Sequence, residues 1–205
     1  MTKLTWKYKA YLPKNMIVVF GGAFNPPTVA HFEVIKHLLK QPFINEVMLM
    51  PVGDHYEKPG MVSAEHRFNM LQEMVKNLLD VTTSDVEIKA PKALKTVETL
   101  EILNGLYPEE EFAFVMGADN LAQLSSWSQH ERLVKNYKMI VLNRDQLDVH
   151  ALIQSQFPAE VDQFIVVSDF AEMAISATDY RENPGKKELL CSGVAKYIEK
   201  HGLYR

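Results

Sequence analysis

Short apolar runs rich in β-branched and aromatic residues alternate with longer amphipathic stretches from residue 16 onward. The short runs predict strands, which cover residues 16–20, 47–50, 85–89, 112–116, 139–142 and 164–167. The longer stretches predict helices, which cover residues 28–40, 63–79, 96–106, 126–135 and 187–201. Strands separated by helices favour a mostly parallel sheet with helices on both faces. The sequence therefore predicts a single α/β domain, whose ligands sit beyond the carboxyl ends of the strands.

The size and charge of the chain narrow its class. With 205 residues, 47% of them hydrophobic, the chain suits one globular domain, since chains usually divide only beyond about 250 residues. We expect residues 1–15 to be an N-terminal extension and residues 16–205 to form that domain. A lone cysteine, Cys191, cannot form an internal disulfide, which fits a cytoplasmic location. The net charge of -4 and the lack of a run of about 18 apolar residues argue against nucleic acid and membranes as partners. Whether the chain forms a homo-oligomer stays an open question.

Residues 21–31 join the first predicted strand to the first predicted helix. Gly21 and Gly22 let the backbone turn tightly and approach a ligand closely. The backbone N–H groups at the following helix start favour an anion, and His31 lies one turn inside that helix. The spacing matches neither the dinucleotide motif GxGxxG nor the P-loop GxxxxGK[ST], so a dehydrogenase or kinase loses its main support. A histidine near a helix start is usually structural, so a functional role for His31 needs support from a second motif.

That second motif, residues 175–181, follows the last predicted strand. Ser176 and Thr178 suit the N-cap region of a helix, where hydroxyl and N–H groups can meet an anion. Arg181, three residues after Thr178, lies on the same face, and its planar guanidinium can hold phosphate oxygens in pairs. A capped helix start followed by arginine is common, so the motif is weak alone. Two motifs, each after a strand, are much stronger.

Together the motifs resemble those of the nucleotidyltransferase superfamily, which are GGxFxPxHxGH or its [HT]xxH variants, and ISSTxxR. This chain supplies Gly21, Gly22, Phe24, Pro26, Thr28 and His31 in the first, and Ser176, Thr178 and Arg181 in the second. It departs from them at Thr28, where most members carry histidine, at Ala30 and at Ala177. The segments similar to those of nicotinate/nicotinamide mononucleotide adenylyltransferases are residues 51–60, 63–67, 96–100, 117–121 and 126–127. The likeness spans residues 16–184.

The resemblance implies a Rossmann-like fold and transfer of AMP from ATP to nicotinate or nicotinamide mononucleotide, which gives the dinucleotide and pyrophosphate in NAD biosynthesis. It implies that the catalytic residues are His31, Thr28 and Arg181. It implies that ATP is bound by Gly21, Gly22, Ala23, Phe24, Lys58, Gly117, Asp119, Ser176 and Thr178. The mononucleotide would contact Thr99, Trp127 and Arg67. A Mg²⁺ ion is implied as well, held mainly by nucleotide phosphates and water rather than by a cage of acidic side chains.

Several alternatives stay open. Trp127 could be a helix-packing aromatic, Asp119 a turn residue, and the two cations Lys58 and Arg67 solvated charges. At the level of function, another small-substrate nucleotidyltransferase of the same fold remains an alternative. So does a nucleotide sensor that kept the fold without the reaction, which the departures from the two signatures keep open. Pyrophosphate release from ATP, with and without a mononucleotide, separates a sensor from an enzyme.

Overall fold

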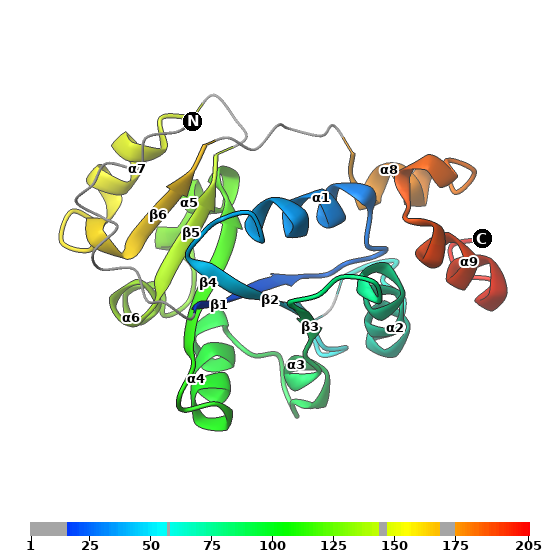
Figure 1. Ribbon diagram of the computed structural model, residues 1–205, viewed down its shortest axis with the longest axis horizontal. Helices are drawn as coiled ribbons and strands as arrows, with labels where there is room; N and C mark the ends of the chain where they lie inside the picture. Colours follow the sequence, from blue (N-terminus) through cyan, green and yellow to red (C-terminus); the bar gives the residue numbers. More distant parts are fainter. Residues whose placement is uncertain (1–15, 57, 144–146, 169–174) are drawn as a thin grey trace. The chain divides into compact units, whose positions relative to one another are not determined.

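The computed structural model describes residues 16–56, 58–143, 147–168 and 175–205, so the predicted extension 1–15 lies outside the described residues. Six strands form one sheet in the order β3-β2-β1-β4-β5-β6 (Figure 1). They are β1 Met16–Gly22, β2 Ile44–Pro51, β3 Val81–Thr83, β4 Glu111–Gly117, β5 Lys138–Leu142 and β6 Phe164–Val167. The pairs β1–β4, β4–β5, β5–β6 and β2–β3 are parallel. The predicted α/β class with a parallel sheet is confirmed.

The helices between the strands follow the predicted periodicity in most places. They are α1 Val29–Leu38, α2 Ala64–Val75, α3 Val86–Lys89, α4 Thr96–Leu106, α5 Ala118–Gln123, α6 His130–Asn136, α7 Val149–Gln156, α8 Ala177–Glu182 and α9 Ser192–His201. Short 3₁₀ turns cover Leu124–Ser126, Val161–Gln163 and Lys187–Leu189. The predicted helix over 126–135 begins only at His130, because Gln129 has a left-handed backbone (φ 63). Among the described residues, no helix has the length and apolar character needed to span a bilayer.

Residues 85–89, predicted as a strand, form the single turn α3 instead. The strand of this region is β3, whose Val81 pairs with Val47 of β2. The Lys89 Nζ atom lies 2.7 Å from Asp85 Oδ2, an i,i+4 ion pair that a helical turn brings together. The turn also packs against Gly53, where an added Cβ would lie 2.2 Å from the Glu87 carbonyl oxygen. Tertiary packing therefore overrides the alternating pattern here.

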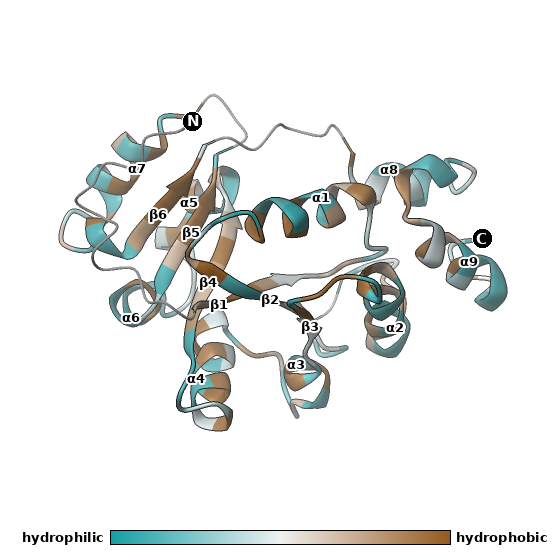
Figure 2. Cartoon of the chain, in the orientation of Figure 1, coloured by the Kyte–Doolittle hydropathy of each residue, from teal (hydrophilic) through white to brown (hydrophobic). Residues whose placement is uncertain are grey.

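The chain falls into two compact units, described one at a time. Unit 1 lies within Met1–Val19, Gln41–Glu46 and Lys95–Glu172, and unit 2 within Phe20–Lys40, Val47–Leu94 and Met173–Arg205. In unit 1, α4 and α5 contact β4, with Leu100 and Leu121 fully buried. In unit 2, α2 contacts β3 and α9. Figure 2 shows the strands mostly in the hydrophobic colours and the helices with both kinds of residue. That residues 16–205 form a single domain stays a prediction.

Candidate functional site

In unit 2, the loop after β1 turns at Phe24 rather than at the glycine pair. Gly21 and Gly22 belong to β1 itself, and the Gly22 carbonyl accepts a hydrogen bond from Val52 N–H at 3.1 Å. A Cβ at Gly22 would lie 3.3 Å from the Phe24 ring, which makes close approach the reason for a small residue. Phe24 is 2% exposed and has φ 48, a left-handed backbone that non-glycine residues rarely adopt. Its ring lies edge-on to that of His31, with centroids 5.1 Å apart.

His31 is held in one tautomer by the residue that caps its helix. The Thr28 N–H donates to His31 Nδ1 at 2.9 Å, and Thr28 Oγ1 lies 2.9 Å from the same nitrogen. Because Nδ1 accepts a backbone N–H, a neutral ring carries its proton on Nε2. Thr28 is fully buried, at 0% exposure. Thr28 thereby orients the ring of His31, and its predicted direct contact with phosphate stays a prediction.

Asn25, which is not among the predicted site residues, joins several segments of unit 2. Its side chain is 4% exposed, and Nδ2 donates to the Gly60 carbonyl at 3.0 Å. Its Oδ1 accepts from Val62 N–H at 3.2 Å and from the Tyr204 hydroxyl at 2.7 Å. Its backbone carbonyl accepts from Arg181 Nη1 at 2.7 Å. Asn25 therefore connects the loop after β1 to residues 60–62, to α8 and to the segment after α9.

The second predicted motif lies beside the first within unit 2. Besides its bond to Asn25, Arg181 donates from Nη2 to Thr178 Oγ1 at 2.9 Å. Ser176 is the N-cap of α8, as predicted, and its Oγ accepts from Asp179 N–H at 3.1 Å. The Ser176 hydroxyl and N–H both donate to Asp179 Oδ2, at 2.6 and 2.9 Å. These bonds hold the pKa of Asp179 below its ordinary value. An anion at this helix start would therefore meet a hydroxyl already engaged by the Asp179 carboxylate.

The two predicted cations of unit 2 have opposite surroundings. Lys58 is exposed, in keeping with either a phosphate contact or a solvated charge. Arg67 is 0% exposed, so the solvated-charge alternative is wrong for it. It donates to the carbonyl oxygens of Val62 (3.0 Å), Ala23 (3.0 Å) and Val52 (2.7 Å), and to Asp54 Oδ1 (3.4 Å). Burial lowers the pKa of Arg67, and Asp54 opposes that shift. Arg67 thereby connects the loop after β1 to the loop after β2, and its predicted contact with the mononucleotide stays a prediction.

Unit 1 carries the remaining predicted residues. Gly117 is the N-cap of α5, and Asp119 lies exposed in the first turn of that helix rather than in an isolated turn. Thr99 is 2% exposed in α4, and its hydroxyl donates to the Lys95 carbonyl at 3.4 Å. Trp127 is half-buried and lies edge-on to Phe114, with ring centroids 6.2 Å apart. Trp127 therefore packs on the sheet while part of the residue remains accessible.

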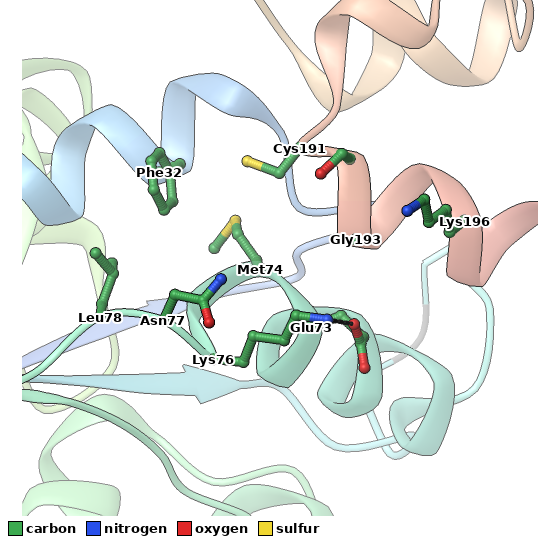
Figure 3. Close-up of a pocket in the computed structure, with 10 residues that line it drawn as sticks. Phe32, Glu73, Met74, Lys76, Asn77, Leu78, Cys191, Gly193 and Lys196 are labelled. Carbon is green, nitrogen blue, oxygen red and sulfur yellow. Dashed lines mark hydrogen bonds and ion pairs between the residues drawn. The ribbon is translucent and has the colours of Figure 1, made fainter.

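A cavity of about 350 Å³ in unit 2 lies away from the predicted residues. Its lining comes from α1, α2 and the start of α9, and includes Phe32, Met74, Cys191 and Lys196 (Figure 3). Burial raises the pKa of Cys191, and the charge of Glu33 raises it further. The thiol is therefore in its unreactive, protonated form at neutral pH. None of the predicted site residues lines this cavity.

Metal-ligating side chains do not gather in the part of the chain that the structure describes. Within residues 16–56, 58–143, 147–168 and 175–205, no three His, Cys, Asp or Glu side chains come close enough to hold an ion. A magnesium ion carried by nucleotide phosphates needs no such cluster. The implied Mg²⁺ stays a prediction.

Comparison with known proteins identifies the family of this chain. A family model described as cytidylyltransferase-like matches residues 19–183. A protein from Acholeplasma laidlawii named "probable nicotinate-nucleotide adenylyltransferase" is 32% identical over 192 residues, which cover 92% of this chain and 97% of that protein. A protein of the same name from Carboxydothermus hydrogenoformans is 29% identical and covers 92% of this chain and 98% of its own.

A solved structure shows the same fold at lower identity. It is described as Plasmodium falciparum nicotinic acid mononucleotide adenylyltransferase complexed with APC, and a second structure holds that protein with NaAD. The first superposes with a TM-score of 0.76 at 22% identity and covers 94% of this chain and 98% of the other. The match to the family model and the full-length relatives agree, and the chain belongs to the cytidylyltransferase-like family, alongside its nicotinate-nucleotide adenylyltransferases.

Proposed function

We propose that this chain transfers AMP from ATP to nicotinate mononucleotide and releases pyrophosphate, as a step of NAD biosynthesis. The observation that carries the proposal is the bond of 2.7 Å from Arg181 to the Asn25 carbonyl. It brings the arginine of one signature against the loop that leads to the histidine of the other, although Arg181 and Asn25 are 156 residues apart in sequence. Relatives of nearly equal length, named for this reaction, support the same substrate pair.

The reaction is an in-line displacement at the α-phosphorus of ATP. A phosphate oxygen of the mononucleotide forms the new P–O bond while the bond to the bridging oxygen of pyrophosphate breaks. The attacking phosphate is already an anion near pH 7, since its second pKa is about 6. No general base and no covalent enzyme intermediate are needed. Catalysis then depends on alignment of the two phosphates and on stabilising the charge that develops between them.

The residues of unit 2 handle phosphate. His31 donates from Nε2 to an oxygen of the α-phosphate, which its fixed tautomer supports. Arg181 binds the phosphate tail, because a guanidinium has five N–H donors and its two bonds within unit 2 do not exhaust it. Thr178 and Ser176 contact phosphate at the start of α8, where the anion takes the place of the Asp179 carboxylate at the Ser176 hydroxyl, and Lys58 adds charge from its exposed loop. Backbone groups of residues 21–24 contact the nucleotide.

The residues of unit 1 bind the ribose and the pyridine ring. The Asp119 carboxylate accepts a hydrogen bond from a hydroxyl of the ATP ribose, and the backbone at Gly117 supports that contact. Trp127 offers a ring face on which the pyridine can stack. Backbone groups near Thr99 recognise the carboxylate of the ring, which sets nicotinate apart from nicotinamide.

Magnesium supplies charge neutralisation on the phosphate oxygens when it is bound with ATP. We expect the nucleotide phosphates and water to hold most of its coordination positions. The cytoplasmic location and a homo-oligomer stay predictions.

The direct test measures pyrophosphate release by the purified full chain with ATP and Mg²⁺. Three parallel reactions contain nicotinate mononucleotide, nicotinamide mononucleotide or neither. We expect release that depends on the mononucleotide, with the higher kcat/KM for nicotinate. A chain that binds ATP but releases no pyrophosphate in any of them is a sensor. A higher kcat/KM for the amide would transfer the proposal to nicotinamide mononucleotide.

A further inference from the structure

The segment after α9 turns back toward the loop that follows β1, within unit 2. Gly202 ends α9 with a left-handed backbone (φ 63), and Leu203 N–H donates to the Ile198 carbonyl at 3.1 Å. This pattern is the Schellman motif, which reverses the chain direction at a helix end. Figure 1 shows the end of the chain beside α8 and α9. The turn brings the Tyr204 hydroxyl to 2.7 Å from Asn25 Oδ1.

We propose that Tyr204 is a positioning residue for the adenylyl transfer and acts through Asn25. The inference rests on the proposed function, because the group it positions is the phosphate-binding loop with Arg181. Tyr204 touches neither substrate in this account. Its hydroxyl sets the orientation of the Asn25 side chain, and Asn25 in turn holds Arg181 and residues 60–62.

The hydrogen bonds of Asn25 fix its amide plane from three directions. The two lone pairs of Oδ1 accept from Val62 N–H and from the Tyr204 hydroxyl, while Nδ2 donates to the Gly60 carbonyl. A buried amide with all of these partners has one orientation. Without the Tyr204 hydroxyl, a nearly buried acceptor would lose its shortest bond. The loop after β1 would then be less well ordered at the residue that precedes Pro26.

The effect reaches the chemistry through the backbone of the same residue. The Asn25 carbonyl is the acceptor for Arg181 Nη1, so the peptide at Asn25 and the guanidinium move together. His31 lies six positions further along the same segment and rests on Phe24, the neighbour of Asn25. A misplacement of about 1 Å in groups that align reactants can cost on the order of 100-fold in rate. A modest loosening of Asn25 therefore lowers turnover rather than substrate affinity.

Two further features show that the position of Tyr204 is specified. Its backbone is left-handed (φ 58), which side chains with a Cβ adopt only where contacts hold them. Its ring lies edge-on to that of Tyr180 in α8, with centroids 5.9 Å apart. Burial raises the pKa of Tyr204, so the hydroxyl keeps its proton and stays a donor at neutral pH. The ring and the hydroxyl thus contact both α8 and the loop.

The test compares Tyr204→Phe with Tyr197→Phe in the full chain. Both variants remove one tyrosine hydroxyl from unit 2, but the hydroxyl of Tyr197 bonds to His66 (3.0 Å) and Asn69 (3.1 Å) instead. The phenylalanine keeps the ring packing against Tyr180. We expect Tyr204→Phe to lower kcat about tenfold, with the KM for ATP within about twofold of wild type. Tyr197→Phe should keep the wild-type kcat.

A double-mutant cycle shows whether Tyr204 acts through its partner. If it does, Tyr204→Phe lowers kcat little further in a chain that already carries Asn25→Ala. Amide hydrogen exchange at Val62 gives a readout without turnover, and it should be faster in Tyr204→Phe than in Tyr197→Phe. Equal kcat values for the two tyrosine variants, or fully additive losses in the cycle, overturn the inference. A wild-type chain that releases no pyrophosphate rejects the proposed function first, and the inference with it.

Discussion

Replacing Arg67 by methionine tests whether this residue is a buried tie between loops or a ligand contact. The side chain is 0% exposed and donates to three backbone carbonyls, those of Val62, Ala23 and Val52. Methionine fills a similar volume but leaves those carbonyls without their donor. At about 1 kcal/mol for each orphaned acceptor, the loss of unfolding free energy is about 3 kcal/mol. The ion pair with Asp54 adds little, because that carboxylate is 63% exposed and 3.4 Å away.

The measurement is thermal unfolding followed by circular dichroism, with Lys76→Met as the control. For a chain of about this size, a loss of 3 kcal/mol lowers Tm by about 6–12 °C. Lys76 follows the same helix, is exposed and pairs with Glu73 at 2.8 Å, so its loss should change Tm by no more than about 2 °C. If the Tm of Arg67→Met equals that of Lys76→Met, the buried hydrogen bonds of Arg67 do not hold the loops together. If Arg67→Met keeps that Tm but raises the KM for the mononucleotide tenfold or more, Arg67 contacts the mononucleotide as the sequence predicts.

Three further changes test separate parts of the site. His31→Ala should lower kcat by about 100-fold or more through loss of one transition-state donor, and full turnover in steady-state assays would remove His31 from the chemistry. Trp127→Ala should raise the KM for the mononucleotide about tenfold, as loss of a stacking face does, and an unchanged KM ends that assignment. The pKa of Asp179 is lowered in the folded chain. The charged carboxylate therefore stabilises the fold above the unfolded-state pKa of about 3.9, and this stabilisation is lost as the pH falls through the lower folded-state pKa. The Tm advantage of wild type over Asp179→Asn should therefore shrink below about pH 4, whereas a constant difference would show that the Ser176 bonds do not act on this carboxylate.

The sheet and most helices follow from the sequence because their signals are local. Apolar runs of strand length and a 3.6-residue period predict the observed strands and helices where the apolar residues are also the buried ones. The Ser63 cap of α2 and the Gly202 end of α9 are of the same local kind. The strand predicted over 85–89 fails because the alternation of Val86 and Ile88 is too short to outweigh packing of that turn against Gly53.

The site is only partly legible from the sequence, since its contacts join distant segments. The two signatures identify His31 and Arg181, but nothing local links Asn25 to Tyr204, 179 residues away. Arg67 could have been recognised as buried. It lies on the same helical face as Met70, Leu71 and Met74, at the spacing of an inward stripe. An arginine in such a stripe needs internal acceptors, and the carbonyls of the two adjacent loops supply them.

The stereochemical course at the α-phosphorus tests the direct transfer most sharply. The chain would be given nicotinate mononucleotide and ATP made chiral at the α-phosphorus by one sulfur atom, and the configuration of the dinucleotide would be determined. A single in-line attack, aligned by His31 and Arg181 without an enzyme-bound intermediate, predicts inversion. Retention would mean two displacements through a covalent adenylyl-enzyme, and would contradict this account.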